Sequence, residues 1–310
     1  MIYTLTLNPS LDKEYRVDDL RMNTVLRAQT AREDIGGKGF NVSRLLANLG
    51  GDSCAVGLVG GRIGQTLSDG LASLGIRSNL VWVKGESRVN TSIVDGMGKH
   101  IKINEAGPAV TGVEETELIR LIKSLARPGD WWVLSGGLPG GLEADFYARL
   151  IALIRGKGAY AALDAHGEAL RLGCRAGPNL VKPNAEEGAE ITGLPSGKPL
   201  ELARIAHAIH DLGARNVVIS AGKVGALAFD GQKAWLAEAP AIAEVNPTGA
   251  GDAMLAGLVF GLDGGKGLAD ALALGAACGA AAAGMPGTAM PSRSRVFDLL
   301  KKITIRELGV

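Results

Sequence analysis

The chain has 310 residues, of which 46% are hydrophobic and 21% charged, and this globular composition excludes a disordered chain. Its 33 lysines and arginines nearly balance its 32 aspartates and glutamates, which excludes a generally basic nucleic-acid binder. The length fits one large domain, or one domain with an appendage. The three cysteines, Cys54, Cys174 and Cys278, lie far apart, so we expect neither a disulfide framework nor a zinc site, and a reducing cytoplasm.

Two segments bear on targeting. Residues 1–7 have no basic start and no cleavage site, so we expect a first strand there, not a signal peptide. Residues 271–292 carry no charge, but they are mostly alanine and glycine and include Pro286 and Pro291. We expect this stretch to form a buried core helix and not a membrane span.

Short apolar runs alternate with helix-like segments along the chain. The expected strands are residues 2–7, 53–59, 131–134, 160–163, 180–182, 216–220 and 226–229. The expected helices are residues 41–49, 65–74, 114–125, 144–154, 200–212, 250–262, 268–283 and 292–302. This alternation predicts an α/β fold with a mostly parallel sheet, helices on both faces, and a ligand beyond the carboxyl ends of the strands.

Two polar segments break this alternation. In residues 86–104, an alternating run is followed by an Asp-Gly-Met-Gly turn and a second short run, which indicates a hairpin. We interpret residues 13–35 and 86–104 as a small β-rich lid over the ligand edge, with residues 1–12, 36–85 and 105–310 as the α/β core. Ordinary surface hairpins are the alternative.

The strongest local pattern is Asn-Pro-Thr-Gly-Ala-Gly-Asp at residues 246–252, which opens directly onto an apolar helix. Such a turn presents free backbone N–H groups in front of the positive end of a helix dipole, which suits a phosphoryl group. Asp252 lies in the first turn, where a carboxylate could accept a proton from a hydroxyl that attacks phosphorus. The alternative is that Thr248 or Asp252 only caps the helix.

A second glycine turn, Gly-Gly-Lys-Gly-Phe-Asn-Val-Ser-Arg at residues 36–44, enters an amphipathic helix. Its glycines allow close approach to a ligand, Lys38 offers a point charge for phosphate, and Asn41 can bind sugar hydroxyls. A flexible, solvated turn is the alternative. The sequence has neither a Walker A loop, nor a dinucleotide fingerprint, nor the motifs of protein kinases.

These two patterns resemble the paired signatures of the ribokinase (pfkB) family of carbohydrate kinases, and the resemblance covers essentially the whole chain. Residues 6–12 and 37–39 resemble the branch of 1-phosphofructokinase and tagatose-6-phosphate kinase, and residues 181–184 and 220–225 fit the same branch. The resemblance implies a ribokinase-like, three-layer α/β/α fold that is doubly wound and has a small β lid. It also implies an enzyme that uses ATP and Mg²⁺.

On the sugar side, the resemblance implies substrate contacts from Asp12, Gly37, Lys38, Gly39, Asn41, Arg88, Asn90 and, as a weaker candidate, Lys102. Asp12 would accept a sugar hydroxyl, Lys38 would hold the phosphate already on the sugar, and Arg88 and Asn90 would close over that phosphate. An ordinary turn aspartate remains open for Asp12, and a solvated hairpin face for Arg88 and Asn90.

On the nucleotide side, the resemblance implies an anion hole formed by Gly249, Ala250 and Gly251, with Asp252 as the catalytic base. The nucleotide would be approached by Lys182, Asn184, Ser220, Gly222, Gly225 and Gly251. Glu187, in an Asn-x-x-Glu motif, would help to hold magnesium through water; a helix start at Asn184 is the alternative. The small residues at 275–284 would leave room for adenine, or would only pack the core.

We therefore expect ATP-dependent phosphorylation of fructose 1-phosphate to fructose 1,6-bisphosphate, with tagatose 6-phosphate as the second substrate choice and 6-phosphofructokinase activity third. Two positions point away from 6-phosphofructokinase activity. The branch that uses fructose 6-phosphate usually has glycine where this chain has Lys38, and it tends to carry lysine near Val25. Gly137 replaces a serine common in relatives, which leaves fine substrate choice open.

Two functions from other classes remain as alternatives. One is a non-catalytic sugar-phosphate sensor on a kinase fold, and the other is a nucleoside kinase, which Lys38 and Arg88 disfavour because a nucleoside has no phosphate to hold. The family often dimerises through its lid, so we expect a homodimer, and no nucleic-acid or membrane partner.

Overall fold

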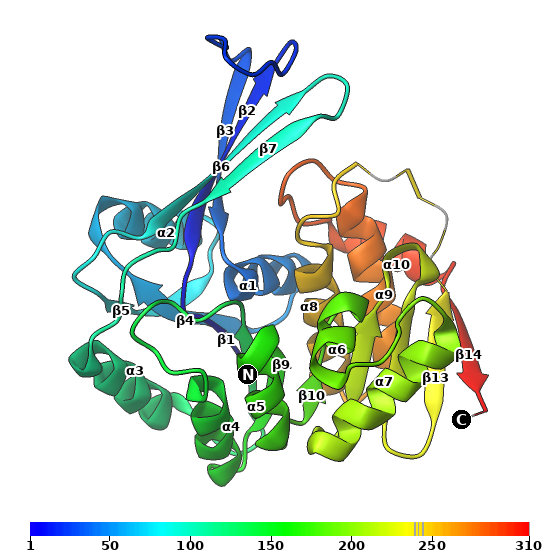
Figure 1. The fold of residues 1–310 in the computed structure, drawn as a ribbon. Coiled ribbons are helices and arrows are strands. Elements are labelled where there is room, and N and C mark those ends of the chain that lie inside the picture. Colours follow the sequence, from blue (N-terminus) through cyan, green and yellow to red (C-terminus); the bar gives the residue numbers. More distant parts are fainter. Residues whose placement is uncertain (239, 241, 244, 310) are drawn as a thin grey trace.

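The computed structural model describes residues 1–238, 240, 242–243 and 245–309. Its core is a ten-stranded sheet in the order β14-β13-β12-β11-β10-β9-β8-β1-β4-β5 (Figure 1). The strands of this sheet are β1 (Ile2–Thr6), β4 (Ser53–Val59), β5 (Arg77–Trp82), β8 (Trp131–Ser135), β9 (Tyr160–Asp164), β10 (Leu180–Val181), β11 (Val217–Ser220), β12 (Ala226–Phe229), β13 (Ala234–Glu238) and β14 (Thr304–Leu308).

The helices are α1 (Lys38–Leu49), α2 (Gly61–Ser73), α3 (Gly112–Leu125), α4 (Phe146–Gly156), α5 (Gly167–Arg175), α6 (Ala185–Thr192), α7 (Pro199–Leu212), α8 (Ala250–Asp263), α9 (Leu268–Ala283) and α10 (Arg293–Leu300), with a short 3₁₀ turn at Gly222–Val224. The strands from β5 to β11 in the sheet order pair in parallel, whereas β11 to β14 pair antiparallel. The chain winds outward from β1 in both directions, which makes the sheet doubly wound.

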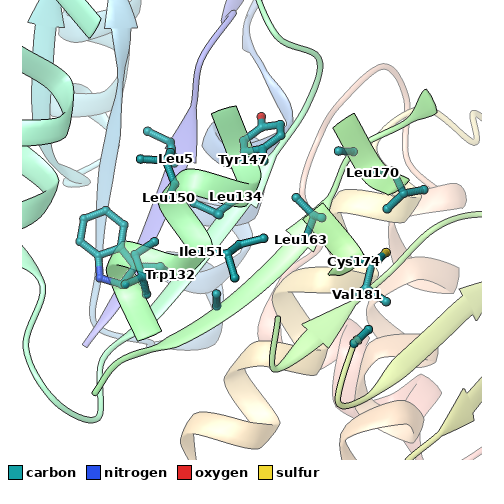
Figure 2. Packing of buried hydrophobic residues seen from close by; sticks show 14 of the residues in the cluster. Leu5, Trp132, Leu134, Tyr147, Leu150, Ile151, Leu163, Leu170, Cys174 and Val181 are labelled. Carbon is teal, nitrogen blue, oxygen red and sulfur yellow. The ribbon is translucent and has the colours of Figure 1, made fainter. Parts of the chain in front are cut away.

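Alternation along the strands builds a hydrophobic layer on each face of the sheet. On one face, Leu5 and Trp132 pack with side chains of α3, α4, α5 and α7, and Figure 2 shows part of this cluster. On the other face, Ile2 and Val133 pack with side chains of α1, α8, α9 and α10. Because both faces are covered, the central strands are mostly apolar and largely buried, as expected for a parallel sheet.

Residues 271–283 of the uncharged segment lie in α9, which is buried against α8, whereas residues 284–292 follow the helix and are not helical. At Gly257 of α8, an added Cβ would lie 2.7 Å from Cys278 Sγ and 2.9 Å from the Gly275 Cα, both on α9. The small residues therefore allow the two helices to pack closely. Among the described residues, no helix combines the length and the apolar character that crossing a membrane requires.

A separate four-stranded sheet forms the lid, in the order β3-β2-β6-β7. Its strands are β2 (Ser10–Val17), β3 (Thr30–Gly36), β6 (Arg88–Asp95) and β7 (His100–Asn104). Figure 1 shows the lid projecting from one side of the core. Because β2 begins at Ser10, Asp12 lies on the lid strand itself, not at the end of the core segment where we expected it.

The predicted fold class is confirmed, and most predicted elements are present. Helix α1 begins at Lys38, three residues before the predicted start, because Gly37 is its N-cap. Strands β5, β13 and β14 and helices α5 and α6 were missed. β5 and β14 are the partly exposed edges of the sheet and carry charged residues, so they lack the continuous apolar run on which the predictions relied.

Candidate active site

A cleft of about 390 Å³ lies between the lid and the carboxyl ends of the core strands. Many predicted site residues line it: Asp12, Gly37, Lys38, Asn41, Arg88, Asn90, Lys182, Asn184, Glu187, Ser220, Gly249, Gly251 and Asp252. The two glycine turns, distant in the chain, thus lie against one cavity. This position beyond the strand ends is where ligands bind in open α/β sheets.

Asp252 lies in the first turn of α8 and is only 7% exposed. Its Oδ2 accepts a hydrogen bond of 2.9 Å from Asn41 Nδ2 on α1. Burial, reinforced by the negative charge of Asp164, raises the pKa of Asp252 to about 6, although Lys38, the Asn41 amide and Lys182 oppose this shift. A carboxylate with this pKa is ionised near neutral pH and is a stronger base than an ordinary aspartate.

Asp164 ends strand β9 and is a site residue that sequence reasoning missed. Its buried carboxylate binds two cations: Oδ1 lies 2.7 Å from Lys38 Nζ, and Oδ2 lies 2.9 Å from Lys182 Nζ. Burial alone raises the pKa of Asp164, but the two ammonium groups outweigh burial and hold it at about 2. The ion pairs bring a permanent negative charge and two positive charges together beside Asp252.

Lys38 remains charged in this setting. Burial disfavours its ammonium form, but Asp164 and Asp252 outweigh burial and raise the pKa of Lys38. The second lysine, Lys182, is 3% exposed and lies close to the α8 turn, because a Cβ added to Gly251 would contact its Nζ at 3.4 Å. Two cations therefore face the position where a phosphoryl group would meet the helix N-terminus.

The turn before α8 has the geometry of an anion-binding site, but with a different set of amides from the predicted one. Gly249 has φ +84°, in the left-handed region that glycine adopts readily. The Ala250 N–H is engaged in the turn, where it donates to the Pro247 carbonyl at 3.1 Å. Within the described residues the amides of Gly251 and Asp252 have no backbone acceptor, so these two are available to an anion.

On the lid side, Asp12 is held by its neighbours. Asp12 Oδ1 accepts hydrogen bonds from Ser10 Oγ at 2.7 Å and from Asn90 Nδ2 at 2.9 Å. Burial raises the pKa of Asp12 in spite of these bonds. The Oδ2 atom has no hydrogen-bond donor among the described residues, and Asp12 lines the cleft, where a sugar hydroxyl could donate to its carboxylate.

Arg88 joins the cleft to two of the chain segments that connect the lid with the core. Its Nε donates to the carbonyl of Asn8, just before β2, and its Nη1 donates to the carbonyl of Glu105, just after β7, each at 3.2 Å. The remaining guanidinium nitrogen, Nη2, has no recorded acceptor among the described residues. Arg88 therefore keeps donors for an anion in the cleft while it fixes the base of the lid.

Five predicted residues do not line this cleft. Gly39 packs on β1, because an added Cβ would lie 2.5 Å from Thr6 Oγ1 and 2.7 Å from the Leu5 carbonyl oxygen. Its small size therefore allows the helix to pack closely on the strand. Lys102 lies on the inner side of the lid, where its Nζ donates to Thr248 Oγ1 at 3.2 Å. The other three, Ala250, Gly222 and Gly225, line a second cavity.

The second cavity has a volume of about 810 Å³ and meets the first at Ser220 and Gly251, which line both. Its walls are mostly apolar and include Met254 together with the small α9 residues Ala276, Gly279, Ala280 and Ala283. Gly279 has both roles, because it lines this cavity and a Cβ added to it would lie 3.2 Å from the Ala250 carbonyl oxygen of α8. One polar, charged cleft and one apolar cavity share the glycine turn of α8 between them.

Asn184 and Glu187 begin helix α6 as well as lining the cleft. Asn184 Oδ1 accepts from the Glu187 N–H, and Glu187 Oε2 accepts from the Asn184 N–H, each at 2.8 Å. This capping box is the structural alternative considered for the motif, and it is present. Because it uses only one carboxylate oxygen of Glu187, it is compatible with a second role in the cleft.

Ser10, Thr248 and Thr288 also line the cleft without having been assigned to it. Ser10 and Thr248 stand inside motifs that the sequence already singled out, so their position carried a usable signal. Asp164 follows a predicted strand directly, and the carboxyl end of a parallel strand was the available signal. Thr288 lies in a loop after α9, and no sequence signal indicated its position in the cleft.

A mostly parallel sheet flanked by helices, with a separate small sheet as a lid, is the ribokinase-like fold that solved kinases share with this chain. The chain matches the pfkB family of carbohydrate kinases over residues 6–295, and it belongs to that family. It is thus a sugar-phosphate kinase, a phosphotransferase with an alcohol group as acceptor.

Individual relatives agree with this assignment. Tagatose-6-phosphate kinase of Staphylococcus epidermidis is 34% identical over 267 residues, which is 84% of this chain and 85% of the relative. Phosphofructokinase-2 from Escherichia coli, solved in complex with substrates and products, has a TM-score of 0.92 at 29% identity and covers 97% of this chain and 98% of its own. A possible 1-phosphofructokinase from Thermotoga maritima has a TM-score of 0.89 at 27% identity, with 100% of both chains covered.

Proposed function

We propose that this kinase transfers the terminal phosphoryl group of ATP to the 6-hydroxyl of fructose 1-phosphate, giving fructose 1,6-bisphosphate and ADP. The observation that carries the proposal is the junction of the two cavities at Gly251, beside Asp252. A polar cleft with Asp12, Arg88 and Asn90 suits a hydroxylated, anionic acceptor, and the apolar cavity suits a nucleobase. In-line transfer requires the donor and acceptor to meet at one point, and the junction provides it.

Asp252 is the proposed general base. Its buried carboxylate stands at the junction, and an ionised carboxylate can accept the proton of the attacking hydroxyl while the new oxygen–phosphorus bond forms. Asn41 binds one carboxylate oxygen at 2.9 Å and leaves the other for the hydroxyl. The amides of Gly251 and Asp252 would bind the equatorial oxygens of the phosphoryl group.

The position of Lys38 supports a role at the transferred phosphoryl group, which differs from the role expected from the sequence. Its Nζ forms an ion pair with Asp164, in the same cluster as Lys182 and Asp252, whereas Arg88 lies on the lid strand β6. We therefore propose that Lys38 and Lys182 stabilise the negative charge of the phosphoryl group while it moves from ATP to the sugar. The phosphate already on the sugar is assigned to Arg88, with Lys102 as a second cation on the lid.

Magnesium is expected as the partner of the ATP phosphates, and the residues present fit it. Glu187 lines the cleft and keeps Oε1 outside its capping box. No group of three acidic, histidine or cysteine side chains among the described residues could hold a metal alone, which suits an ion bound mainly by phosphates and water. Glu187 would hold such an ion through water, and the bound ion would neutralise phosphate charge.

Tagatose 6-phosphate is the second substrate candidate, favoured by the 34% identity to the Staphylococcus epidermidis tagatose-6-phosphate kinase. Both sugars are ketohexose monophosphates that carry the reacting hydroxyl at the end opposite the phosphate. ADP release, measured across fructose 1-phosphate, tagatose 6-phosphate, fructose 6-phosphate and the free sugars, tests the proposal. The highest kcat/KM on fructose 1-phosphate supports it, and the highest value on another sugar replaces it. No ADP release on any of them would revive a non-catalytic sensor.

We also propose that two copies associate through the outer face of the lid. Alternation places Tyr15, Ile93, Ile101 and Ile103 on the face opposite Asp12 and Asn90. Near the core, α2 covers this face, since Gly70 of α2 lies against Ile35. Farther out, Ile103 is 57% exposed and Tyr15, Ile93 and Ile101 are partly exposed. Apart from the Lys13–Glu33 ion pair, this part of the face is largely apolar, and no other described element covers it, which is typical of a protein interface.

A further inference from the structure

Arg44 connects the lid to the proposed base through Asn41. It follows Asn41 by three residues on α1, so the two side chains lie on the same side of the helix. Its Nη1 donates to Asn41 Oδ1 at 3.1 Å and to the Ile35 carbonyl of β3 at 3.2 Å, and it lies 3.5 Å from Thr288 Oγ1. Burial lowers the pKa of Arg44, but an arginine stays protonated throughout the working pH range.

The two neighbours of Asn41 determine which way its amide points. Arg44 can only donate hydrogen bonds, so the atom of Asn41 that faces it has to be the carbonyl oxygen. The NH₂ group consequently faces Asp252, and its 2.9 Å bond to Oδ2 requires an acceptor. A protonated Asp252 could still accept this bond at Oδ2, but a neutral carboxyl oxygen accepts more weakly than a carboxylate oxygen does. The amide could accept from the O–H group only after half a rotation, which would break the bond to Arg44.

We propose that Arg44 is a positioning residue of the reaction, a proposal that rests on Asp252 as the proposed base. By occupying Asn41 Oδ1, it keeps the Asn41 NH₂ group toward Asp252, so that the carboxylate form of Asp252 is bound more strongly than the protonated form. Arg44 touches neither the reacting atoms nor Asp252, and it acts through Asn41 alone. Its second hydrogen bond, to the Ile35 carbonyl, links Arg44 to the end of lid strand β3.

Other charges act on these two groups and are present in every variant of Arg44. Asp252 faces Asp164 at the end of β9, Lys38 on α1, and Lys182 after β10. Arg44 itself is near Asp34 and Arg32 on β3 and Asp12 on β2. Because the three charges around Asp252 do not contact Arg44, replacing Arg44 changes mainly the amide orientation.

The test is the pH profile of kcat with Mg·ATP and the preferred ketose phosphate. Arg44→Met keeps the apolar stem and removes every donor, so the midpoint of the acidic limb should rise by about one pH unit, the size expected for one hydrogen bond to a carboxylate. Turnover should fall more at pH 6 than at pH 8.5, and KM for ATP should not change. Arg44→Lys, which keeps a cationic donor, should restore part of the shift.

Two further variants separate this role from a general loss of structure. Arg293→Ala removes another arginine that anchors α1, through the Leu49 carbonyl, and should leave the profile unchanged. If Arg44 acts through Asn41, the double variant Arg44→Met/Asn41→Leu should show the same midpoint as Asn41→Leu alone. Arg44→Gln, too short to reach the Asn41 amide, takes the place of the methionine variant if that variant does not fold.

The possible outcomes distinguish this inference from the function on which it rests. An Arg44 variant whose kcat falls equally at every pH, or whose effect adds to that of Asn41→Leu, overturns the positioning role while the proposed reaction stands. If Asp252→Asn retains turnover, the proposed base and this inference both fail. A raised midpoint that is absent in the Arg293 variant and not additive with Asn41→Leu supports the role.

Discussion

Lys38 Nζ and Asp164 Oδ1 lie 2.7 Å apart, although 126 positions separate them in the chain. This ion pair joins the first turn of α1 to the end of β9, and Asp164 extends it to Lys182. A cation at this place is therefore part of the folded protein before any ligand binds. Preorganised charge of this kind is the main way in which enzymes stabilise a transferred phosphoryl group.

Replacing Asp164 with asparagine should damage both stability and turnover. The change leaves Lys182 buried without its counter-ion, which costs about 3–5 kcal/mol of unfolding free energy. It also removes a negative charge that raises the pKa of Asp252, so any remaining activity should have its acidic limb at lower pH. Urea unfolding and the pH profile of kcat measure the two effects.

Asp298→Asn is the matched control, because Asp298 pairs with Lys301 on the surface and such pairs contribute little. It should change the unfolding free energy by less than about 1 kcal/mol. Equal stability losses in the two variants would contradict the account of the buried cluster.

Asp252→Asn should abolish most turnover while substrate binding survives. The amide cannot accept the hydroxyl proton, so kcat should fall by about 10²–10⁴-fold. Asn41 can still donate to the new carbonyl oxygen, so the local structure should be kept. Coupled ADP release gives kcat, and calorimetric titration with the sugar phosphate gives its Kd. Turnover within tenfold of the wild type would rule out Asp252 as the base.

The same Asp252→Asn variant should be more stable than the wild type at neutral pH. The folded-state pKa of Asp252, about 6, lies above its ordinary value of 3.8, so the folded state binds protons more tightly and loses stability as pH rises between these values. Removing the charge should recover up to about 3 kcal/mol at pH 7.5. Thermal unfolding should show this gain disappear below about pH 4, where the aspartate is protonated in both states. A gain that is independent of pH would contradict the charge explanation.

Asp164 provides the opposite pH dependence within the same protein. Its folded-state pKa, about 2, lies below 3.8, so its contribution to stability is present above pH 4 and is lost as pH falls toward 2.

Filling the apolar cavity should weaken the binding of ATP and leave the binding of the sugar phosphate unchanged. Ala280→Leu adds three carbon atoms to the cavity wall on α9, and the resulting crowding should raise KM for ATP by about tenfold or more. KM for the sugar phosphate should stay near its original value. Ala273→Leu is the control on the same helix, since Ala273 is similarly half-buried but does not line the cavity. If both variants raise KM for ATP equally, the cavity is not the nucleobase site.

A charge on the outer face of the lid should separate the two copies. Ile93→Asp places a carboxylate between Tyr15 and Ile101 in the cross-strand register, which is unfavourable inside an interface. Light scattering should give the mass of a dimer for the wild type and of a monomer for the variant. Val113→Asp, at a position 79% exposed on α3, should remain dimeric. A monomeric wild type would rule out the interface.

Local patterns were enough to find the two glycine turns, because a turn that opens onto a helix is encoded within a few residues. The lid hairpin was found for the same reason: alternation in β6 and β7 and a glycine turn between them are local signals. The edge strands were not found, because an exposed strand with charged residues such as β14 has no apolar run to mark it.

What sequence reasoning could not provide was the partner of each charged group. Lys38 looked like a phosphate ligand on the sugar, since nothing near it in the chain showed that Asp164 would bind it. The hydrogen bond from the Ala250 amide to Pro247 could not be predicted either, because it depends on how the turn closes. Such contacts depend on three-dimensional packing between segments that are distant in the chain.

The meeting of the two cavities at a single shared turn has an evolutionary consequence. The walls that would choose the acceptor belong to lid strands, whereas the walls that would choose the donor belong to a helix at the other end of the chain. Mutations in one wall can therefore change the specificity for the acceptor without changing the specificity for the donor, or the reverse. The central turn, by contrast, is constrained by both. A scaffold divided in this way can change its sugar and keep its chemistry.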